Sequence, residues 1–161
     1  MKVPPSSRGA SRLPTEVTIR PATPADADAI LRLLHQAELP AAGVLDQFPY
    51  AYVLARRDGE IAGVAGLEMY GTSGLLRSMA VAPALRRSGI GRTLVADRLT
   101  TARERGLDAV YLLTTTAAQF FQRLGFSPML REEVPRGLAR SPEFAHACPD
   151  AATCMVLQVR T

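Results

Sequence analysis

The spacing that points most directly to chemistry in this chain is the pair of glycines in Arg86-Arg87-Ser88-Gly89-Ile90-Gly91. The segment follows a run typical of a strand and opens a run typical of a helix. Backbone N–H groups at a helix start, with the positive end of the helix dipole behind them, can bind a doubly charged phosphate. Glycine lets the phosphate approach the backbone, although two glycines at this spacing also fit a simple tight turn.

Better-known phosphate motifs do not fit this loop. No Gly-Lys-Ser/Thr follows Gly91, which excludes a Walker loop. A dinucleotide fingerprint would need a third glycine and an acidic residue for the ribose, and the sequence offers no clear candidate for either. We therefore predict a different phosphate-bearing ligand.

Hydrophobic periodicity and turn residues indicate the elements that position the loop. We expect helices over residues 24–37, 88–105, 116–124 and 134–140. We expect strands over residues 17–20, 50–56, 60–70, 75–81, 108–114, 127–131 and 153–159. This order predicts an α+β (α/β) mixed sheet with helices on both faces.

Composition limits the number of domains and the class of partner. The 161 residues are 47% hydrophobic, which predicts one domain, over 17–161. Residues 1–16 are rich in Pro, Ser, Gly and Arg, so we expect a disordered extension that is neither a signal peptide nor a membrane anchor, and a cytoplasmic protein. The net charge of +4 comes from scattered arginines with only 6% aromatic residues, which favours an anionic small ligand over nucleic acid or membrane.

A longer motif around the glycine loop resembles the core motif of the GCN5-related N-acetyltransferases, the GNAT family. The motif consists of Met79-Ala80-Val81-Ala82-Pro83 followed by Arg86-x-x-Gly89-x-Gly91. The likeness extends to that family's later helix and its terminal Gly-Phe, through Ala117, Phe121, Gly125 and Phe126. It covers nearly everything from Val17 onward, and it implies a GNAT fold whose sheet is splayed between the fourth and fifth strands, with acetyl-CoA in the gap.

The resemblance also implies roles for single residues. The backbone N–H groups of Arg87, Gly89, Gly91 and Arg92 would bind the pyrophosphate. Val81 would pair with the pantetheine arm, and the Met79 N–H would polarise the thioester carbonyl while the acceptor amine attacks directly. The expected coenzyme-binding residues are Met79, Ala80, Val81, Arg86, Arg87, Ser88, Gly89, Ile90, Gly91, Arg92, Phe120 and Phe121.

The sequence departs from the family pattern at the residues expected to move protons. Many relatives carry a Glu or His base on the fourth strand, where this chain has Leu75 and Arg77, and a Tyr acid where it has Phe121. Strand alternation would place Arg77 on the same face as Met79, toward the acceptor. A guanidinium there could bind a carboxylate or phosphorus-type oxyanion in bidentate fashion, and the alternative is a surface arginine on a sheet edge.

Glu68 is the candidate partner of this arginine. If Tyr70 and Leu75 close the hairpin over the turn at 71–74, Glu68 faces Arg77 directly across the ladder. Glu68 is then either the general base or a structural ion-pair partner. The candidate catalytic residues are Glu68, Met79 and Ser78, and the candidate acceptor-binding residues are Arg77, Glu68 and Thr115.

Runs in the C-terminal half indicate the acceptor. They resemble the bacterial arsenic-resistance N-acetyltransferases, which are similar to the acetyltransferase domain of N-acetylglutamate synthase. The runs are residues 112–117, Phe120-Phe121, Gly125-Phe126, Val134-Pro135, Glu143-Phe144, Cys148-Pro149 and Cys154-Met155. The resemblance implies a carboxylate-bearing amino-acid acceptor: arsinothricin, phosphinothricin or glutamate. One alternative is acetylation of a protein N-terminus or another amine. A second is a non-catalytic acetyl-CoA sensor, which the missing Glu and Tyr suggest. A homodimer is also possible, because many relatives dimerise.

The two cysteines invite a different reading. Cys148 and Cys154, with His146 nearby, suggest an arsenite site. Acetylation needs no bond between arsenic and thiolate, however, so we interpret both cysteines as small apolar residues and expect no metal.

Overall fold

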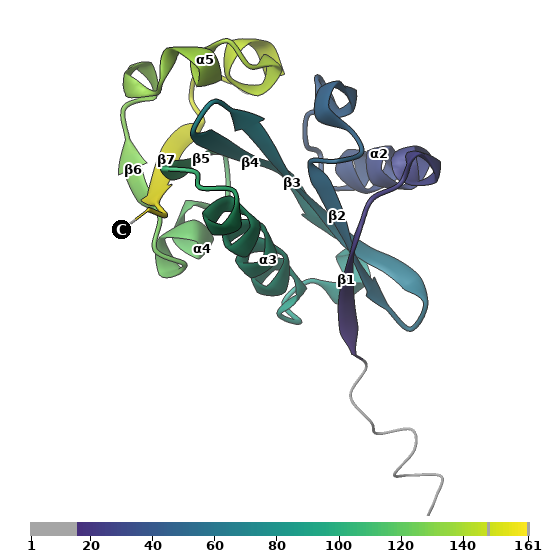
Figure 1. Cartoon of the computed structure of the whole chain (residues 1–161). Coiled ribbons are helices and arrows are strands. Elements are labelled where there is room, and N and C mark those ends of the chain that lie inside the picture. Colours follow the sequence, from purple (N-terminus) through teal and green to yellow (C-terminus); the bar gives the residue numbers. More distant parts are fainter. Residues whose placement is uncertain (1–15, 148, 161) are drawn as a thin grey trace, which may run out of the picture.

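The computed structural model describes residues 16–147 and 149–160, which contain a seven-stranded mixed sheet (Figure 1). The strand order is β1-β2-β3-β4-β5-β7-β6, and only the pair of β4 and β5 is parallel. The strands are β1 (Val17–Pro21), β2 (Tyr52–Arg57), β3 (Glu60–Tyr70), β4 (Ser73–Val81), β5 (Ala109–Thr114), β6 (Ser127–Met129) and β7 (Thr153–Gln158). The predicted mixed sheet is confirmed, whereas the predicted extension over 1–16 lies outside the described residues except for Glu16.

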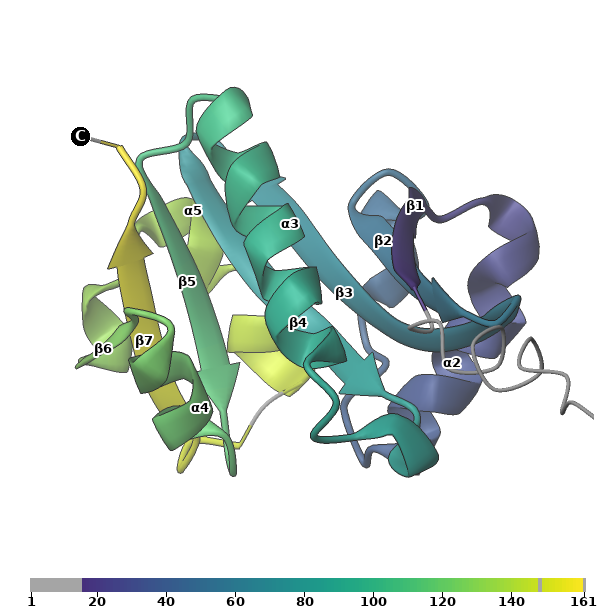
Figure 2. The ribbon, with the colours of Figure 1, turned by 90° about the horizontal axis from the view of Figure 1, so that it is seen from below.

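Helices cover both faces of the sheet, as expected (Figures 1 and 2). Apolar residues of α2 pack on one face, and those of α3 and α4 pack on the other. The helices are α2 (Ala27–Gln36), α3 (Ile90–Glu104), α4 (Ala118–Arg123) and α5 (Arg136–Ala139). Shorter turns are 3-10 helices at Pro24–Asp26, Val44–Gln47, Pro83–Leu85 and Arg131–Glu133 and a π-helix at Glu143–Ala147.

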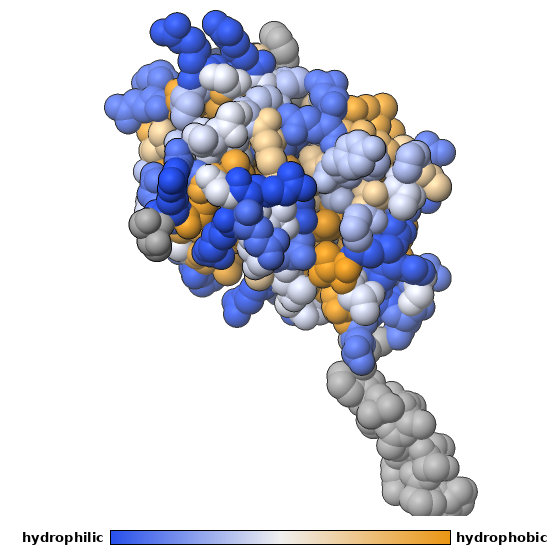
Figure 3. Space-filling view, viewed as in Figure 1, coloured by the Kyte–Doolittle hydropathy of each residue, from blue (hydrophilic) through white to orange (hydrophobic). Residues whose placement is uncertain are grey.

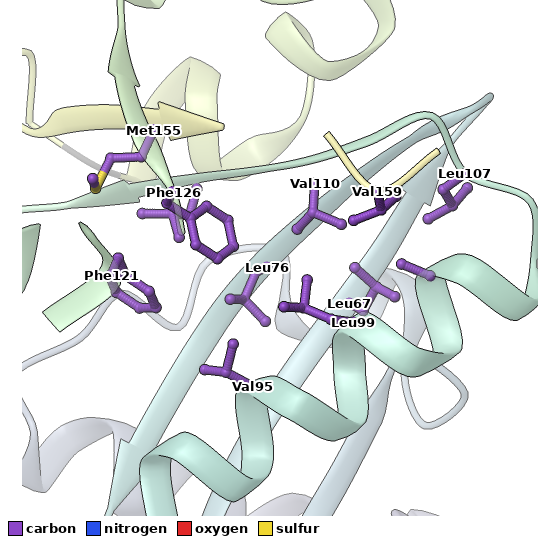
Figure 4. Packing of buried hydrophobic residues seen from close by; sticks show 12 residues of the cluster. Leu67, Leu76, Val95, Leu99, Leu107, Val110, Phe121, Phe126, Met155 and Val159 are labelled. Carbon is purple, nitrogen blue, oxygen red and sulfur yellow. The ribbon is translucent and has the colours of Figure 1, made fainter. Parts of the chain in front are cut away.

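The core between α3 and the sheet fixes the start of that helix. Val95 and Leu99 of α3 lie against Leu67 of β3 and Leu76 of β4 (Figure 4). None of the four is more than 8% exposed, and burying one such side chain stabilises the fold by about 1.5–3 kcal/mol. The helix is therefore held rigidly across the sheet, with its N-terminus next to the end of β4.

The hairpin between β3 and β4 is tighter than the sequence predicts. Tyr70 pairs with Ser73, so the turn consists of two residues, and Gly71 has a φ of +64° that suits such a turn. The predicted turn at 71–74 and the predicted closure of Tyr70 against Leu75 are wrong. Ser73 and the residue after it already pair with the start of β5, which extends β4 backward by two residues.

This register changes the residues that face one another. Glu68 is opposite Leu75, and Arg77 is opposite Gly66, so the predicted direct pairing of Glu68 with Arg77 is wrong. The two side chains still meet diagonally, because long side chains reach the diagonal neighbour across an antiparallel ladder.

A bulge in β4 also alters which side chains share a face. The stretch from Arg77 to Ala80 is three steps long, whereas the facing stretch of β3 from Val64 to Gly66 is two. Ser78 takes up the extra residue with a left-handed φ of +56°. Met79 consequently packs toward α3, while the Arg77 guanidinium contacts the segment that follows α2. The predicted shared face of Arg77 and Met79 is therefore wrong.

The parallel pair opens after a short contact. Ser73–Leu75 of β4 pair with Ala109–Tyr111 of β5, and the strands then diverge toward their C-terminal ends (Figure 2). The rest of β5 pairs with β7 on its other edge. The predicted splay between the fourth and fifth strands is confirmed.

The surface offers few large apolar side chains. Leu45, Tyr50 and Leu130 are the large hydrophobic residues exposed among those described. Figure 3 shows hydrophilic side chains over much of one face, with separate apolar patches between them. No helix in the described ranges has the length and apolarity to cross a bilayer.

Candidate active site

The splayed ends of β4 and β5 border a cleft of about 1100 Å³. Residues 76–81 line it on one side and residues 112–117 on the other. The loop and helix start over 85–92 contribute from the side of α3, and residues 37–40, directly after α2, contribute from the opposite side. We call these two sides the α3 face and the α2 face of the cleft.

Charge divides between the two faces. The charged residues that line the α3 face are all arginines: Arg86, Arg87 and Arg92, with Arg123 at the end of α4. The charged residues at the α2 face, among those described, are Arg77, Glu38 and Glu143. The α3 face is thus built for a polyanion, and the α2 face for a molecule that carries charges of both signs.

The glycine loop has the backbone geometry of an anion site. Arg87 and Gly89 adopt left-handed φ values of +67° and +89°, which turn the chain into α3. The first backbone bond of the helix runs from the Thr93 N–H to the Gly89 carbonyl at 3.1 Å. The N–H groups of residues 90–92 therefore have no acceptor inside the helix, and Gly91 and Arg92 lie at the cleft.

The position of Gly91 has space for a larger side chain within the protein. A Cβ at this position would lie 3.5 Å from Phe120 Cζ and 3.9 Å from Met79 Cε, which are ordinary van der Waals distances. Packing within the chain therefore does not demand glycine here. Close approach of a ligand to the backbone does explain the glycine, so this loop fits a pyrophosphate.

Most of the residues predicted to form the site lie together in the cleft. The predicted residues that line it are Arg77, Ser78, Met79, Ala80, Val81, Arg86, Arg87, Gly89, Gly91, Arg92, Thr115, Phe120 and Phe121. The described lining does not include Ser88, Ile90 or Glu68. Ser88 is exposed and its hydroxyl donates to the Leu85 carbonyl, Ile90 packs in the core, and Glu68 is fully buried.

Arg77 is buried at the α2 face with only 3% of its surface exposed, so the alternative of a surface arginine is wrong. Its Nε donates to Ser78 Oγ at 2.9 Å, and its Nη2 donates to the Ala42 carbonyl at 2.7 Å. Nη2 also lies 3.4 Å from Glu143 Oε1, and Nη1 lies 3.6 Å from Glu68 Oε2. Nη1 is buried and faces Glu68, and it has no hydrogen-bond partner among the described residues.

Glu68 lies behind Arg77 rather than in the cleft. The Tyr70 hydroxyl donates to its Oε1 at 2.7 Å, and the Tyr52 hydroxyl donates to its Oε2 at 3.3 Å. Burial raises the pKa of the Glu68 carboxyl, against the opposing effects of Tyr70, Arg77 and Tyr52. Burial also raises the pKa of both tyrosines. The group acts as a hydrogen-bonded counterion for the arginine.

Two segments far apart in the sequence meet beside Arg77. An added Cβ on Gly43 would lie 2.5 Å from Pro142 Cβ, and the φ of Gly43 is +78°. The segment after α2 therefore touches the segment after α5, next to Glu143. This contact closes part of the α2 face of the cleft.

Sequence reasoning did not place three charged residues of the cleft: Glu38, Arg123 and Glu143. Glu38 follows the end of α2 in a left-handed conformation, with a φ of +56°. Glu143 opens an isolated π-helix in a segment without hydrophobic periodicity. The family resemblance included the Glu143-Phe144 run but assigned it no role, and no periodic signal places the three residues, because tertiary contacts position their segments.

Residues 17–126 match the model of the Acetyltransferase (GNAT) family. The chain belongs to this family. The resemblance seen in the sequence is thereby confirmed for the larger part of this GNAT domain. Glu143 and the other lining residues of the C-terminal segment lie beyond the matched residues.

The relatives found by sequence are acetyltransferases, and each alignment covers only part of both chains. The GNAT domain is 34% identical over 98 residues to an amino-acid acetyltransferase of Pseudomonas fluorescens, covering 60% of this chain and 23% of that protein. It is 29% identical over 104 residues to an N-acetyltransferase of Chlorobaculum tepidum, covering 64% of each. The chain thus spans about a quarter of the length of the amino-acid acetyltransferase that it matches.

Solved structures share the fold of this GNAT domain. N-acetylglutamate synthase from Neisseria gonorrhoeae, complexed with coenzyme A and N-acetyl-glutamate, superposes with a TM-score of 0.78 at 21% identity, covering 92% of this chain and 36% of that one. A Mycobacterium tuberculosis protein in complex with CoA gives a TM-score of 0.75 at 23% identity, covering 88% and 98%. These likenesses support the fold of the cleft.

Proposed function

We propose that this GNAT domain transfers the acetyl group of acetyl-CoA to the amine of a small, carboxylate-bearing amino acid. The observation that carries the proposal is the buried guanidinium of Arg77 at the α2 face, which lies 3.4 Å from the carboxylate of Glu143, another residue that lines the cleft. The relatives named amino-acid acetyltransferase and the structural neighbour that holds N-acetyl-glutamate support the same class of acceptor.

The α3 face is where we place the coenzyme. Acetyl-CoA supplies the acetyl group as a thioester, which an amine can attack. The N–H groups at the start of α3 and the arginines Arg86, Arg87, Arg92 and Arg123 are suited to its pyrophosphate and its third phosphate. The unpaired edge of β4 after Leu75 can pair with an extended amide-bearing arm, and the Met79 N–H would polarise the reacting carbonyl.

The α2 face is where we place the acceptor. The Arg77 guanidinium would bind its carboxylate, and the hydroxyls of Ser78 and Thr115 at the cleft would complete the polar contacts. The finer proposal is a glutamate-like acceptor: glutamate itself, phosphinothricin or arsinothricin. The sequence also predicts that Glu68 removes the amine proton, and this role stays a prediction. The Glu68 carboxylate lies behind Arg77 and not in the cleft.

The contact between Gly43 and Pro142 supports a small acceptor over a protein N-terminus. A peptide needs an open groove along which its following residues can leave the active site. Here the segments after α2 and α5 meet next to the arginine, and so narrow the α2 face. A single amino acid needs no such exit.

The proposal is tested by incubating the purified chain with acetyl-CoA and a panel of amines while free thiol is measured. The panel contains glutamate, phosphinothricin, arsinothricin, a simple alkylamine and a short peptide with a free N-terminus. We expect thiol release with at least one of the three amino acids. Turnover of the peptide alone would support the protein N-terminal acetyltransferase, and coenzyme binding without turnover of any amine would support a sensor.

A further inference from the structure

Glu143 is the buried carboxylate of the cleft. The carboxylates that line it, among the described residues, are those of Glu38 and Glu143. Glu38 is exposed, whereas Glu143 is only 4% exposed and lies at the α2 face. A carboxylate removed from water and adjacent to an acceptor site is a candidate for proton transfer, which requires a group within reach of the reacting nitrogen.

The backbone that carries Glu143 is firmly held. Ser141 Oγ accepts a hydrogen bond from the Phe144 N–H at 3.3 Å. The Arg131 guanidinium donates to the Phe144 carbonyl at 2.8 Å and to the Pro149 carbonyl at 2.7 Å. The preceding Pro142 packs against the segment that follows α2. These contacts hold the backbone of Glu143 next to Arg77 by packing and hydrogen bonds.

The ion pair between Glu143 and Arg77 is open to exchange. The Glu143 Oε1 lies 3.4 Å from Arg77 Nη2, which is longer than a good charge-assisted hydrogen bond. The same Nη2 is already engaged at 2.7 Å with the Ala42 carbonyl. An acceptor carboxylate with better geometry can therefore replace Glu143 as the counterion of the arginine at the cleft.

We propose that Glu143 takes the proton from the ammonium of the acceptor, after the acceptor's carboxylate has replaced Glu143 on Arg77. This inference rests on the proposed amino-acid acetyltransferase function. Glu143 has the advantage over Glu68 that it lines the cleft, whereas Glu68 lies outside the described lining.

The chemical step balances with the groups present. One ammonium proton moves to a carboxylate oxygen of Glu143, and the freed amine nitrogen attacks the carbonyl carbon of the thioester. The new C–N bond forms as the C–S bond breaks. The sulfur leaves with the bonding pair and takes the second proton released by the nitrogen, which gives the thiol. Glu143 then returns its proton to water.

The exchange on Arg77 explains why a carboxylate-bearing acceptor would be favoured. While Glu143 is paired with the guanidinium, the nearby positive charge opposes protonation of the carboxylate. Binding of the acceptor's own carboxylate neutralises that charge, and the buried Glu143 becomes the better proton acceptor. An amine without a carboxylate leaves Glu143 on Arg77, and it therefore reacts slowly.

The test compares Glu143→Gln with the wild type on an amino acid that the panel shows to be an acceptor. Positioned general bases contribute typically 10²–10⁴-fold, so we expect kcat to fall by about 100-fold or more, with the KM for acetyl-CoA unchanged. Glu68→Gln should lower kcat much less. On the simple alkylamine the Glu143→Gln effect should be within about threefold. Glu132→Gln, an exposed glutamate of the same region, is the matched control and should behave as wild type.

The possible results support or overturn the role of Glu143 as follows. A kcat for Glu143→Gln within about threefold of the wild type on the amino acid overturns the inference and leaves the proposed function standing. A large loss in Glu68→Gln alone assigns the base to Glu68 and also overturns it. If Glu143→Gln no longer binds coenzyme A, Glu143→Asp decides, because a shortened carboxylate should lower kcat and keep coenzyme binding. A wild type that acetylates no amino acid overturns the proposed function itself, and the inference with it.

Discussion

Glu68 and Arg77 meet diagonally across the β3–β4 ladder, with 3.6 Å between Oε2 and Nη1, although Leu75 occupies the position directly opposite Glu68. Both side chains are fully buried. Their attraction in a low-dielectric interior offsets the cost of burying the charges only while both partners are present. The pair therefore holds the guanidinium at the α2 face of the cleft, where we place the acceptor's carboxylate.

Replacing Arg77 by Lys tests the planar fork separately from its charge. Lysine keeps a positive charge but cannot form the bidentate contact, so we expect the KM for the amino-acid acceptor to rise about tenfold. The KM for acetyl-CoA should not change, because Arg77 lies away from the glycine loop. Steady-state kinetics with each substrate varied measures both values. Arg103→Lys, on the exposed face of α3, is the control, and an unchanged acceptor KM in Arg77→Lys would refute the role.

Substitution of the two glycines of the loop by alanine should change stability in opposite directions. Gly91→Ala should leave the melting temperature unchanged or raised, because its methyl group meets only ordinary contacts and alanine favours a helix by about 1 kcal/mol. Coenzyme A should nevertheless bind more weakly, because the methyl group occupies the approach to the backbone. Calorimetric titration and thermal unfolding separate the two effects.

Gly89→Ala provides the contrast. Its added methyl group meets open space, but a φ of +89° strains any other residue. We expect a loss of about 1 kcal/mol in the free energy of unfolding. If Gly91→Ala binds coenzyme A as tightly as the wild type does, the loop is only a turn.

Glu68 should make stability depend on pH in an unusual direction. Its folded-state pKa is raised by burial, so the folded protein holds this proton more tightly than the unfolded chain does. As pH rises from below the unfolded value of about 4.3 through the folded value, the wild type should lose stability relative to Glu68→Gln. Denaturant unfolding of both proteins across this range measures the difference, and a constant or growing advantage for the wild type would contradict the direction.

Asp26 should act in the opposite sense. The hydrogen-bonded guanidinium of Arg20 lowers the pKa of this carboxyl, against its burial, and the Thr23 N–H adds a further donor at 2.7 Å. Its stabilisation is complete above the unfolded value of about 3.9 and is lost as pH falls through the lower folded value. Asp26→Asn should therefore melt below the wild type at pH 7, with the gap closing in acid. Asp28→Asn, an exposed neighbour, is the matched control and should melt as the wild type does at pH 7.

Local signals were enough to predict the scaffold of the site. The strand before Arg86 and the helix start at the glycines depend on near neighbours in sequence, so the phosphate loop could be placed. The seven strands followed from periodicity, and the opening between the fourth and fifth followed from the family resemblance alone.

Long-range contacts set the strand register and the side-chain directions that could not be predicted from the sequence. The pairing of Ser73 with Ala109 in β5 lengthens β4 and shifts the hairpin by two residues. The left-handed Ser78 breaks the alternation, which sends Arg77 and Met79 to different sides. A serine at position 73 or 78 does not by itself indicate a longer strand or a bulge. Glu143 reaches the cleft only because its segment packs against Gly43.

In the proposed function, Arg77 selects acceptors by their carboxylate. The most direct test is the ratio of kcat/KM for the best amino-acid acceptor to kcat/KM for the amine that lacks only its carboxylate. A hydrogen-bonded pair with a charged group is worth about 1.5–3 kcal/mol, so we expect a ratio of about 10 to 100 or more in the wild type. The ratio should also fall sharply in Arg77→Lys. A wild-type ratio near one, unchanged by Arg77→Lys, would show that Arg77 does not bind the acceptor's carboxylate.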